Sequence, residues 1–205
     1  KTKYPNLSVF VLGHSMGSWV ALSILNNKSD INGMILTGSS KIPKVLILSQ
    51  LLIIELEVLL KGDKGISLFL DNITFRKFNN AFKPNTSPND WLSSDITSVA
   101  NYTDDPLCGF KVTNGLWKDL SYGLLSIFKK NFYSKKNKNI PILLMTGEND
   151  QATQGSKLSL NLYNFLSLIF NNVSFKVIKN ARHEIFSEFN KNYSYKNLLL
   201  FISNK

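Results

Sequence analysis

The stretch Gly13-His14-Ser15-Met16-Gly17 fits the pattern G-x-S-x-G, and the segments on either side of it decide the fold. Residues 7–12 before it are apolar and partly β-branched, which predicts a strand, and residues 18–25 after it carry apolar side chains at helical spacing. A serine between a strand and a helix sits in a strained turn that exposes its hydroxyl. We expect Gly13 and Gly17 to let the strand and the helix approach closely. The stretch therefore predicts a nucleophile elbow with Ser15 as the nucleophile.

The composition describes a globular protein of 205 residues, with 43% hydrophobic and 19% charged residues, and excludes a disordered chain. Its formal net charge is +10, from 24 Lys and Arg against 14 Asp and Glu. The densest basic segment, residues 129–138, also carries aromatic side chains and is compatible with nucleic acid or an anionic membrane surface. We favour a solvated loop, expect no nucleic-acid partner, and keep open a peripheral contact with a membrane surface.

The single cysteine, Cys108, excludes an internal disulfide and fits a reducing compartment, so we expect the protein to be cytoplasmic. A catalytic Cys108 would need a base nearby, and the sequence shows none. The most apolar segment, residues 45–60, is short and contains glutamates, so the sequence predicts no transmembrane helix. No signal peptide is visible in the chain.

Apolar runs alternate with helical patterns along the chain, which predicts an α/β fold with a parallel sheet flanked by helices. The expected strands are residues 7–12, 31–38, 140–147 and 173–178, and the expected helices of the core are residues 18–25, 156–170 and 195–202. Residues 41–138 form a long, mostly helical insertion that opens with an apolar helix at 45–60, and we expect it to be a cap or lid over the catalytic face. The core would then consist of residues 1–40, with the elbow, and 139–205, with the acid and the base.

The first strand begins only a few residues into the chain, so its outer edge has no predicted neighbour. We therefore expect the chain to be the C-terminal portion of a longer protein.

The remaining catalytic groups follow from the positions of the chain's two histidines. His14 lies inside the elbow, so its side chain should point away from the Ser15 hydroxyl, and we expect it to be structural. His183 follows the fourth strand and is the remaining candidate base. Glu148 and Asp150 both follow the third strand, and we favour Asp150 as the acid because it lies further into the loop. A turn or N-cap role for the aspartate and a backbone-satisfied loop histidine are the alternatives.

The order serine, aspartate, histidine, with each residue just past a strand end, predicts a catalytic triad. The backbone N–H of Met16 would supply one oxyanion donor at the start of the helix. The second donor normally comes from a loop after an earlier strand, which this chain does not contain, so we expect the site to be incomplete. This chemistry requires no cofactor and no metal.

Several motifs resemble the lysophospholipase and monoacylglycerol-lipase-like α/β hydrolases, a group often classed with serine aminopeptidases. The matching motifs are residues 13–17, 33–38, 146–150 and 181–185, and residues 90–95 and 104–110 of the insertion resemble bacterial members. The resemblance implies the C-terminal portion of an α/β-hydrolase fold and cofactor-free hydrolysis of carboxylic esters through an acyl-serine. It assigns the nucleophile to Ser15, the acid to Asp150 and the base to His183. The family's N-terminal strands and His-Gly oxyanion loop have no counterpart here.

The sequence therefore predicts a serine hydrolase of monoacyl lipids, with the helix at 45–60 lining the acyl pocket. Two alternatives stay open: an aminopeptidase-type serine hydrolase, and a catalytically incomplete hydrolase that at most binds apolar ligands.

Overall fold

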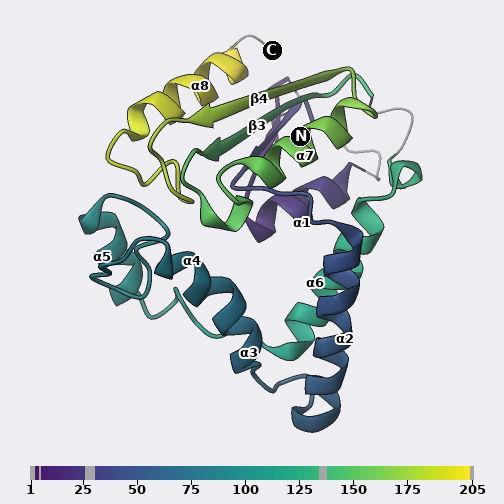
Figure 1. The fold of residues 1–205 in the computed structure, drawn as a ribbon. Coiled ribbons are helices and arrows are strands. Elements are labelled where there is room, and N and C mark those ends of the chain that lie inside the picture. The colour runs from purple at the N-terminus through teal and green to yellow at the C-terminus, as the bar shows by residue number, and fades with distance from the viewer. Residues whose placement is uncertain (1–2, 5, 26–30, 134–137, 204–205) are drawn as a thin grey trace.

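A four-stranded parallel sheet forms the centre of the protein (Figure 1). The computed structural model describes residues 3–4, 6–25, 31–133 and 138–203. The strands are β1 (Phe10–His14), β2 (Gly33–Thr37), β3 (Pro141–Gly147) and β4 (Asn172–Ile178), in the order β1-β2-β3-β4. All neighbouring pairs are parallel, as the alternation of strand and helix patterns predicted.

Helices cover both faces of this sheet. On one face, α1 (Met16–Ile24) and α7 (Lys157–Ser167) pack Leu22 and Leu162 against Leu36 and Leu144. On the other face, α8 (Lys191–Ser203) lies across the strands, where Ile35, Leu143 and Met145 are buried (Figure 1). Successive residues of a strand point to opposite faces, so β2 and β3, buried on both, are apolar at nearly every position.

The segment between β2 and β3 is mostly helical and extends away from the carboxyl edge of the sheet (Figure 1). We call it the helical insertion. It contains α2 (Lys44–Lys61), α3 (Leu68–Asp71), the π-helix η1 (Asn72–Arg76), α4 (Lys77–Asn80), α5 (Ile96–Asp104), α6 (Asn114–Ile127) and the 3₁₀ helix η2 (Lys130–Phe132). Its role as a separate cap between residues 41 and 138 stays a prediction.

The first strand is displaced from its predicted range of residues 7–12. Its ladder with β2 begins where Phe10 lies opposite Gly33 and runs on to His14, so β1 includes the first two residues of the G-x-S-x-G stretch. At its start, the Val9 N–H donates to the Asn32 side chain over 2.8 Å instead of to a strand. Smaller shifts affect α7, which ends at Ser167, and α8, which begins at Lys191.

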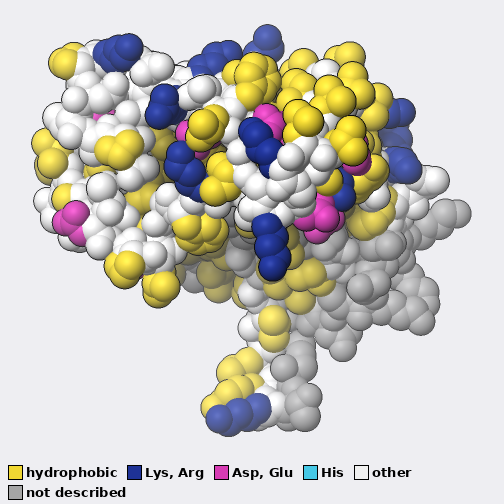
Figure 2. Space-filling view, turned by 90° about the horizontal axis from the view of Figure 1, so that it is seen from below, with side chains coloured by type: hydrophobic (Ala, Val, Ile, Leu, Met, Phe, Trp, Pro, Cys, Tyr) yellow, Lys and Arg dark blue, Asp and Glu magenta, His cyan; other side chains and the backbone are white. Residues whose placement is uncertain are grey.

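The apolar helix expected at 45–60 is confirmed as α2, but it is not buried. It packs along α6, with Ile47 and Ile54 inside the contact. Most of its other apolar side chains are exposed, and Leu59 is 81% exposed. Hydrophobic side chains with Lys and Arg among them are seen on the molecule viewed from below (Figure 2).

Among the described residues, no helix combines the length and the apolar character needed to cross a bilayer. The basic segment 129–138 lies partly outside the described residues, since positions 134–137 are not described, and the predictions made for it stay predictions.

Candidate active site

Ser15 occupies a sharp turn between β1 and α1. Its φ of 51° and ψ of −123° place a non-glycine residue in a conformation that costs about 1–3 kcal/mol and persists only where the surroundings enforce it. The Ser15 N–H donates to the Thr37 carbonyl over 2.9 Å, and its carbonyl accepts from the Ser18 N–H over 3.0 Å. The strand–turn–helix geometry predicted for this stretch is therefore present.

The two elbow glycines have different roles. A Cβ on Gly13 would lie 2.6 Å from the Gly17 carbonyl oxygen and 2.9 Å from the Ala21 side chain, so Gly13 permits the close approach of β1 and α1. A Cβ on Gly17 would meet no atom within 4 Å. The expectation that both glycines are needed for close packing is therefore wrong for Gly17.

Asp150 and His183 meet at the carboxyl edge of the sheet. The imidazole Nδ1 of His183 lies 3.0 Å from both carboxylate oxygens of Asp150, and the two side chains are 2% and 0% exposed. The Ala152 N–H donates to Asp150 over 2.9 Å at the start of the 3₁₀ helix η4 (Gln151–Thr153), so Asp150 is also an N-cap. Glu148, the other predicted acid, is exposed and accepts from the Asn180 N–H instead.

This buried contact changes the pKa of both groups. Burial disfavours the charged imidazole of His183, but the charge and the hydrogen bond of Asp150 outweigh it, so the pKa of His183 lies above its ordinary value. Burial likewise opposes ionisation of Asp150, and the His183 charge and hydrogen bond hold its pKa below the ordinary value. The arrangement therefore favours an aspartate anion beside a basic imidazole.

An apolar pocket of about 390 Å³ connects these residues. Ser15, Met16 and His183 line it together, although no hydrogen bond joins the Ser15 hydroxyl to His183 among the described contacts. Catalytic hydrogen bonds of this kind commonly tighten only when substrate binds. Met16 begins α1 and lines the pocket, and the first N–H groups of a helix have no intrahelical acceptor, so its backbone N–H stays the candidate oxyanion donor.

The helical insertion provides most of the apolar lining. Aromatic side chains dominate it: Phe75, Phe78, Trp91, Tyr102, Phe110 and Trp117. The helix predicted to line the acyl pocket contributes a single residue of α2, the polar Gln50, to the lining. Most of its apolar side chains are exposed or lie against α6, whereas η1, α4 and α6 contribute aromatic rings to the pocket.

A short segment of the insertion contacts the loop that carries His183. The Trp91 ring lies over the His183 ring, with centroids 4.9 Å apart and planes inclined by 34°. The Glu184 N–H donates to the Leu92 carbonyl over 2.7 Å, and the Arg182 guanidinium donates to the Ser93 carbonyl over 3.0 Å. The candidate base is therefore packed against the insertion.

A buried carboxylate completes this contact. Glu188 is fully buried and accepts from the Arg182 N–H over 2.5 Å and from the Ser94 N–H over 3.0 Å; the Ser94 hydroxyl donates to it as well. We call residues 90–94 and 182–188, with these bonds, the insertion latch. Sequence reasoning singled out residues 90–95 and 181–185 but did not predict these contacts, since nothing local in the chain indicates that residues about 90 positions apart bond to each other.

His14 was predicted to be structural and to point away from the Ser15 hydroxyl, and its role stays a prediction. It is one of the residues that line the pocket beside Ser15. Its ring also contacts His183, with centroids 4.7 Å apart.

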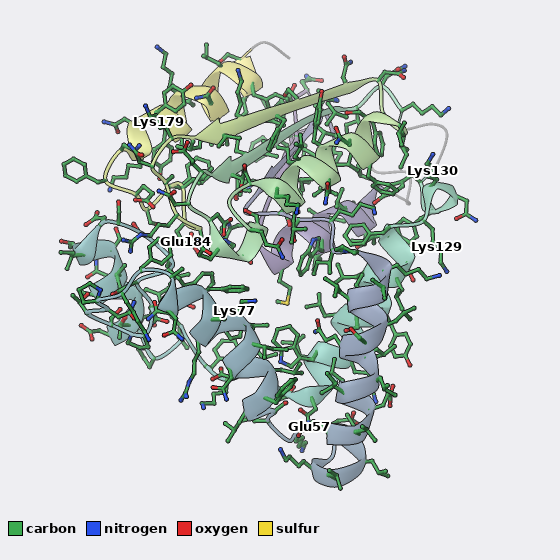
Figure 3. All side chains as sticks on the ribbon, viewed as in Figure 1. Glu57, Lys77, Lys129, Lys130, Lys179 and Glu184 are labelled. Carbon is green, nitrogen blue, oxygen red and sulfur yellow. The ribbon has the colours of Figure 1, made fainter. Side chains whose placement is uncertain are left out.

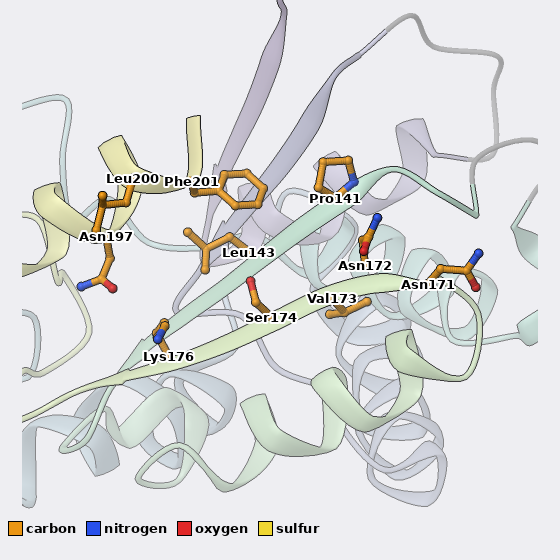
Figure 4. Close-up of a pocket in the computed structure, with 10 residues that line it drawn as sticks. All are labelled: Pro141, Leu143, Asn171, Asn172, Val173, Ser174, Lys176, Asn197, Leu200 and Phe201. Atoms are coloured by element: carbon orange, nitrogen blue, oxygen red, sulfur yellow. The ribbon is translucent and has the colours of Figure 1, made fainter. Parts of the chain in front are cut away.

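A second groove, of about 470 Å³, lies beside α8 on the β3–β4 surface (Figure 4). Its lining includes Leu143, Ser174, Lys176, Asn197 and Phe201 but none of the candidate catalytic residues. Among the described residues, no group of three or more His, Cys, Asp and Glu side chains is arranged to hold a metal ion. The pocket beside Ser15 is therefore the candidate active site.

The sequence profile of the family described as serine aminopeptidase, S33, matches residues 1–190. A comparison with curated protein sequences gave no match. Among solved structures, the chain is similar to a highly thermostable carboxyl esterase from Bacillus coagulans in complex with glycerol, with 23% identity and a TM-score of 0.81. That match covers 98% of this chain and 65% of the esterase, so the chain spans less than two thirds of its length.

Two lipases are also similar. A soluble variant of monoglyceride lipase from Saccharomyces cerevisiae, in complex with a substrate analog, matches with 20% identity and a TM-score of 0.69, over 98% of this chain and 64% of the lipase. Monoacylglycerol lipase from Paleococcus ferrophilus matches with 19% identity and a TM-score of 0.65, over 98% of this chain and 70% of the lipase. At these identities the matches establish a shared fold.

Proposed function

Because the chain belongs to the serine aminopeptidase S33 family and shares the α/β-hydrolase fold, we propose that it is a serine hydrolase that cleaves carboxylic esters of monoacyl lipids. One observation carries the proposal: Ser15 at a strained elbow and His183 paired with Asp150 line one apolar pocket. Monoacylglycerols and lysophospholipids are the substrates that such a pocket would fit.

The proposed reaction uses each group in turn. His183 takes the proton of the Ser15 hydroxyl as the oxygen attacks the ester carbonyl, and Asp150 stabilises the imidazolium that forms. The Met16 N–H donates to the oxyanion of the tetrahedral intermediate. His183 then protonates the departing alcohol, which leaves an acyl-serine. Water, deprotonated by His183, attacks the acyl-serine and releases the fatty acid and the free serine.

The pocket lining favours an acyl group over a peptide. An aminopeptidase binds the free α-ammonium of its substrate, which calls for an available carboxylate. Among the described lining residues, Glu184 is the one carboxylate, and its Oε1 lies 3.0 Å from the His14 ring. The surrounding aromatic rings suit a hydrocarbon chain.

A fluorophosphonate probe tests the nucleophile, since it reacts covalently with activated serines. We expect the chain to be labelled and Ser15→Ala to abolish labelling, while Ser49→Ala, on the exposed side of α2, labels as the wild type does. Labelling that survives Ser15→Ala would contradict the assignment. A folded wild-type chain that is not labelled would favour the alternative of an incomplete hydrolase that only binds apolar ligands.

Substrate class requires a separate comparison. We expect p-nitrophenyl esters of long acyl chains to be cleaved faster than short ones, and both faster than aminoacyl arylamides. Preference for the arylamides would support the aminopeptidase alternative instead.

We also propose a cytoplasmic location with peripheral contact at membranes. The net charge of +10 and the exposed leucines of α2 support this contact. Cosedimentation with anionic but not zwitterionic vesicles, reduced by Leu59→Ser, is the expected result; no binding to either would contradict it.

A further inference from the structure

A second histidine–carboxylate pair lies beside the candidate base. His14 Nε2 is 3.0 Å from Glu184 Oε1, and the two side chains are 26% and 30% exposed. On its other side, His14 Nδ1 is 2.9 Å from the Thr37 hydroxyl. Both ring nitrogens of His14 therefore have a polar atom close by, although the contact of Nε2 with Glu184 lacks the geometry of a hydrogen bond. Glu184 lies where the loop after β4 faces the insertion (Figure 3).

The ring of His14 also contacts the ring of His183, with centroids 4.7 Å apart and planes inclined by 56°. Gly38 makes this contact sterically feasible. Its φ is +56°, and a Cβ there would lie 2.8 Å from His183 Cε1 and 2.9 Å from His14 Cε1. The chain thus has no side chain at the position where the two rings converge.

The pair also has a distinctive place in the chain. His14 directly precedes Ser15, and Glu184 directly follows His183. The contact between them joins the end of β1 to the loop after β4, across the ends of β2 and β3. It therefore forms a link between the segment of the proposed nucleophile and the segment of the proposed base that is separate from the Asp150–His183 bond.

We propose that His14 and Glu184 are a positioning pair that holds the His183 ring in register with Ser15. The inference rests on the proposed function for the roles of Ser15 and His183. Neither member of the pair exchanges a proton with substrate; both act through the orientation and the electrostatic surroundings of His183.

The charges around His183 support this role. The titratable groups that face it are Asp150, Glu184 and His14, and the insertion presents the uncharged Trp91 ring. Burial opposes ionisation of Glu184, yet the adjacent His14 imidazole holds the pKa of Glu184 below its ordinary value. Glu184 is thus an anion near the base, and after Asp150 its charge also raises the pKa of His183.

The charge of Glu184 has only a small effect on the pKa values of the titratable groups of the insertion that lie near it. Tyr102 and Cys108 have raised pKa values, chiefly through burial, with a smaller contribution from the Glu184 charge. Both are neutral near pH 7, so the balance of charge at His183 depends on Asp150, Glu184 and His14.

Because the chain contains two histidines, NMR of isotopically labelled histidine follows both rings directly and needs no turnover. We expect Glu184→Gln to shift the titration of His183 to lower pH, because a carboxylate that favours the imidazolium is lost. Asp63→Asn, which breaks the remote ion pair with Lys118, is the matched control and should leave His183 unchanged. An unchanged His183 titration in Glu184→Gln would overturn the proposal.

Fluorophosphonate labelling supplies the second measurement. We expect Glu184→Gln to slow labelling on the order of tenfold, in line with the sensitivity of catalysis to small displacements. Thr37→Val removes the hydroxyl neighbour of His14 but keeps all charges and side-chain shape, and it should slow labelling as well. Wild-type labelling rates in both variants would also overturn the proposal. If the wild type itself is not labelled, the proposed function fails, and the His183 titration alone decides the role of the pair.

Discussion

From the contacts of the insertion latch, we predict how much its buried carboxylate, Glu188, contributes to the stability of the fold. Glu188 is fully buried and accepts from the Arg182 N–H at 2.5 Å, next to the equally buried His183. Its other partner, Ser94, is exposed, so water can replace the carboxylate there. Replacing Glu188 by alanine should therefore cost mainly the bond to Arg182.

The size of the loss follows from that contact. A hydrogen bond to a charged group contributes about 1.5–3 kcal/mol, and a buried donor left unpaired costs a similar amount. We expect Glu188→Ala to lower the free energy of unfolding by about 2.5 kcal/mol and Ser94→Ala by less than about 1 kcal/mol. Glu188→Gln keeps an acceptor for the Arg182 N–H, so it should lose only about 1 kcal/mol.

Urea denaturation followed by circular dichroism measures these differences, and the slope against urea should stay constant across the variants. At this chain length, Glu188→Ala should also lower Tm by about 5–10 °C. Equal losses for Glu188→Ala and Ser94→Ala would refute the reasoning, because they would mean that the Arg182 N–H contact carries no particular weight. A Glu188→Gln variant as unstable as Glu188→Ala would do the same.

Three further predictions concern the candidate active site. Asp150→Asn should slow ester hydrolysis on the order of 10³–10⁴-fold and, by lowering the pKa of His183, move the midpoint of the pH–rate profile to lower pH; an unmoved midpoint would contradict this. Gly13→Ala should lower the free energy of unfolding measured in urea by about 2 kcal/mol. Gly17→Ala adds a Cβ that meets no atom, so it should leave this free energy unchanged or raise it by up to about 1 kcal/mol. Equal effects of the two variants would refute the distinction. The pKa values of Asp150 and Glu184 are lowered in the folded state. Their contribution to the free energy of unfolding is therefore present above the ordinary carboxyl range of about 4 and is lost as pH falls through the folded-state pKa values. Tm should decrease as the pH is lowered below about 4, and a constant Tm from pH 3 to 6 would contradict this.

Local patterns in the sequence were sufficient to predict the sheet and the residues that meet at its edge. The strands before Ser15 and before Asp150 are short apolar runs, and each candidate catalytic residue lies within five residues of the end of a strand. Because parallel strands end at one edge of the sheet, the order of the strands along the chain was enough to predict that Asp150 and His183 lie together there. The sequence thus predicted a contact between them, which the structure shows at 3.0 Å.

The content of the insertion was less predictable. The composition of α2 indicated an apolar helix, but the sequence of an almost uniformly apolar helix does not reveal which side faces a pocket. In the structure, Gln50 is the residue of α2 that lines the pocket. The contacts of Trp91 with His183 and of Glu188 with Ser94 join segments about 90 residues apart. No periodicity or spacing records such pairs, so they required the structure.

The insertion latch has a consequence for the design of chimeric proteins. Exchanging the insertion between proteins of this fold is a route to a different pocket, because this segment provides most of the apolar lining. In this chain, however, residues 90–94 also hold the loop of His183, through Trp91 and the bonds to Arg182 and Glu188. A graft with junctions at residues 41 and 138 would replace residues 90–94 but keep residues 182–188, which they contact. Junctions that leave residues 90–94 in place, or that transfer residues 182–188 as well, would keep the contacts of the candidate base His183 while changing the pocket.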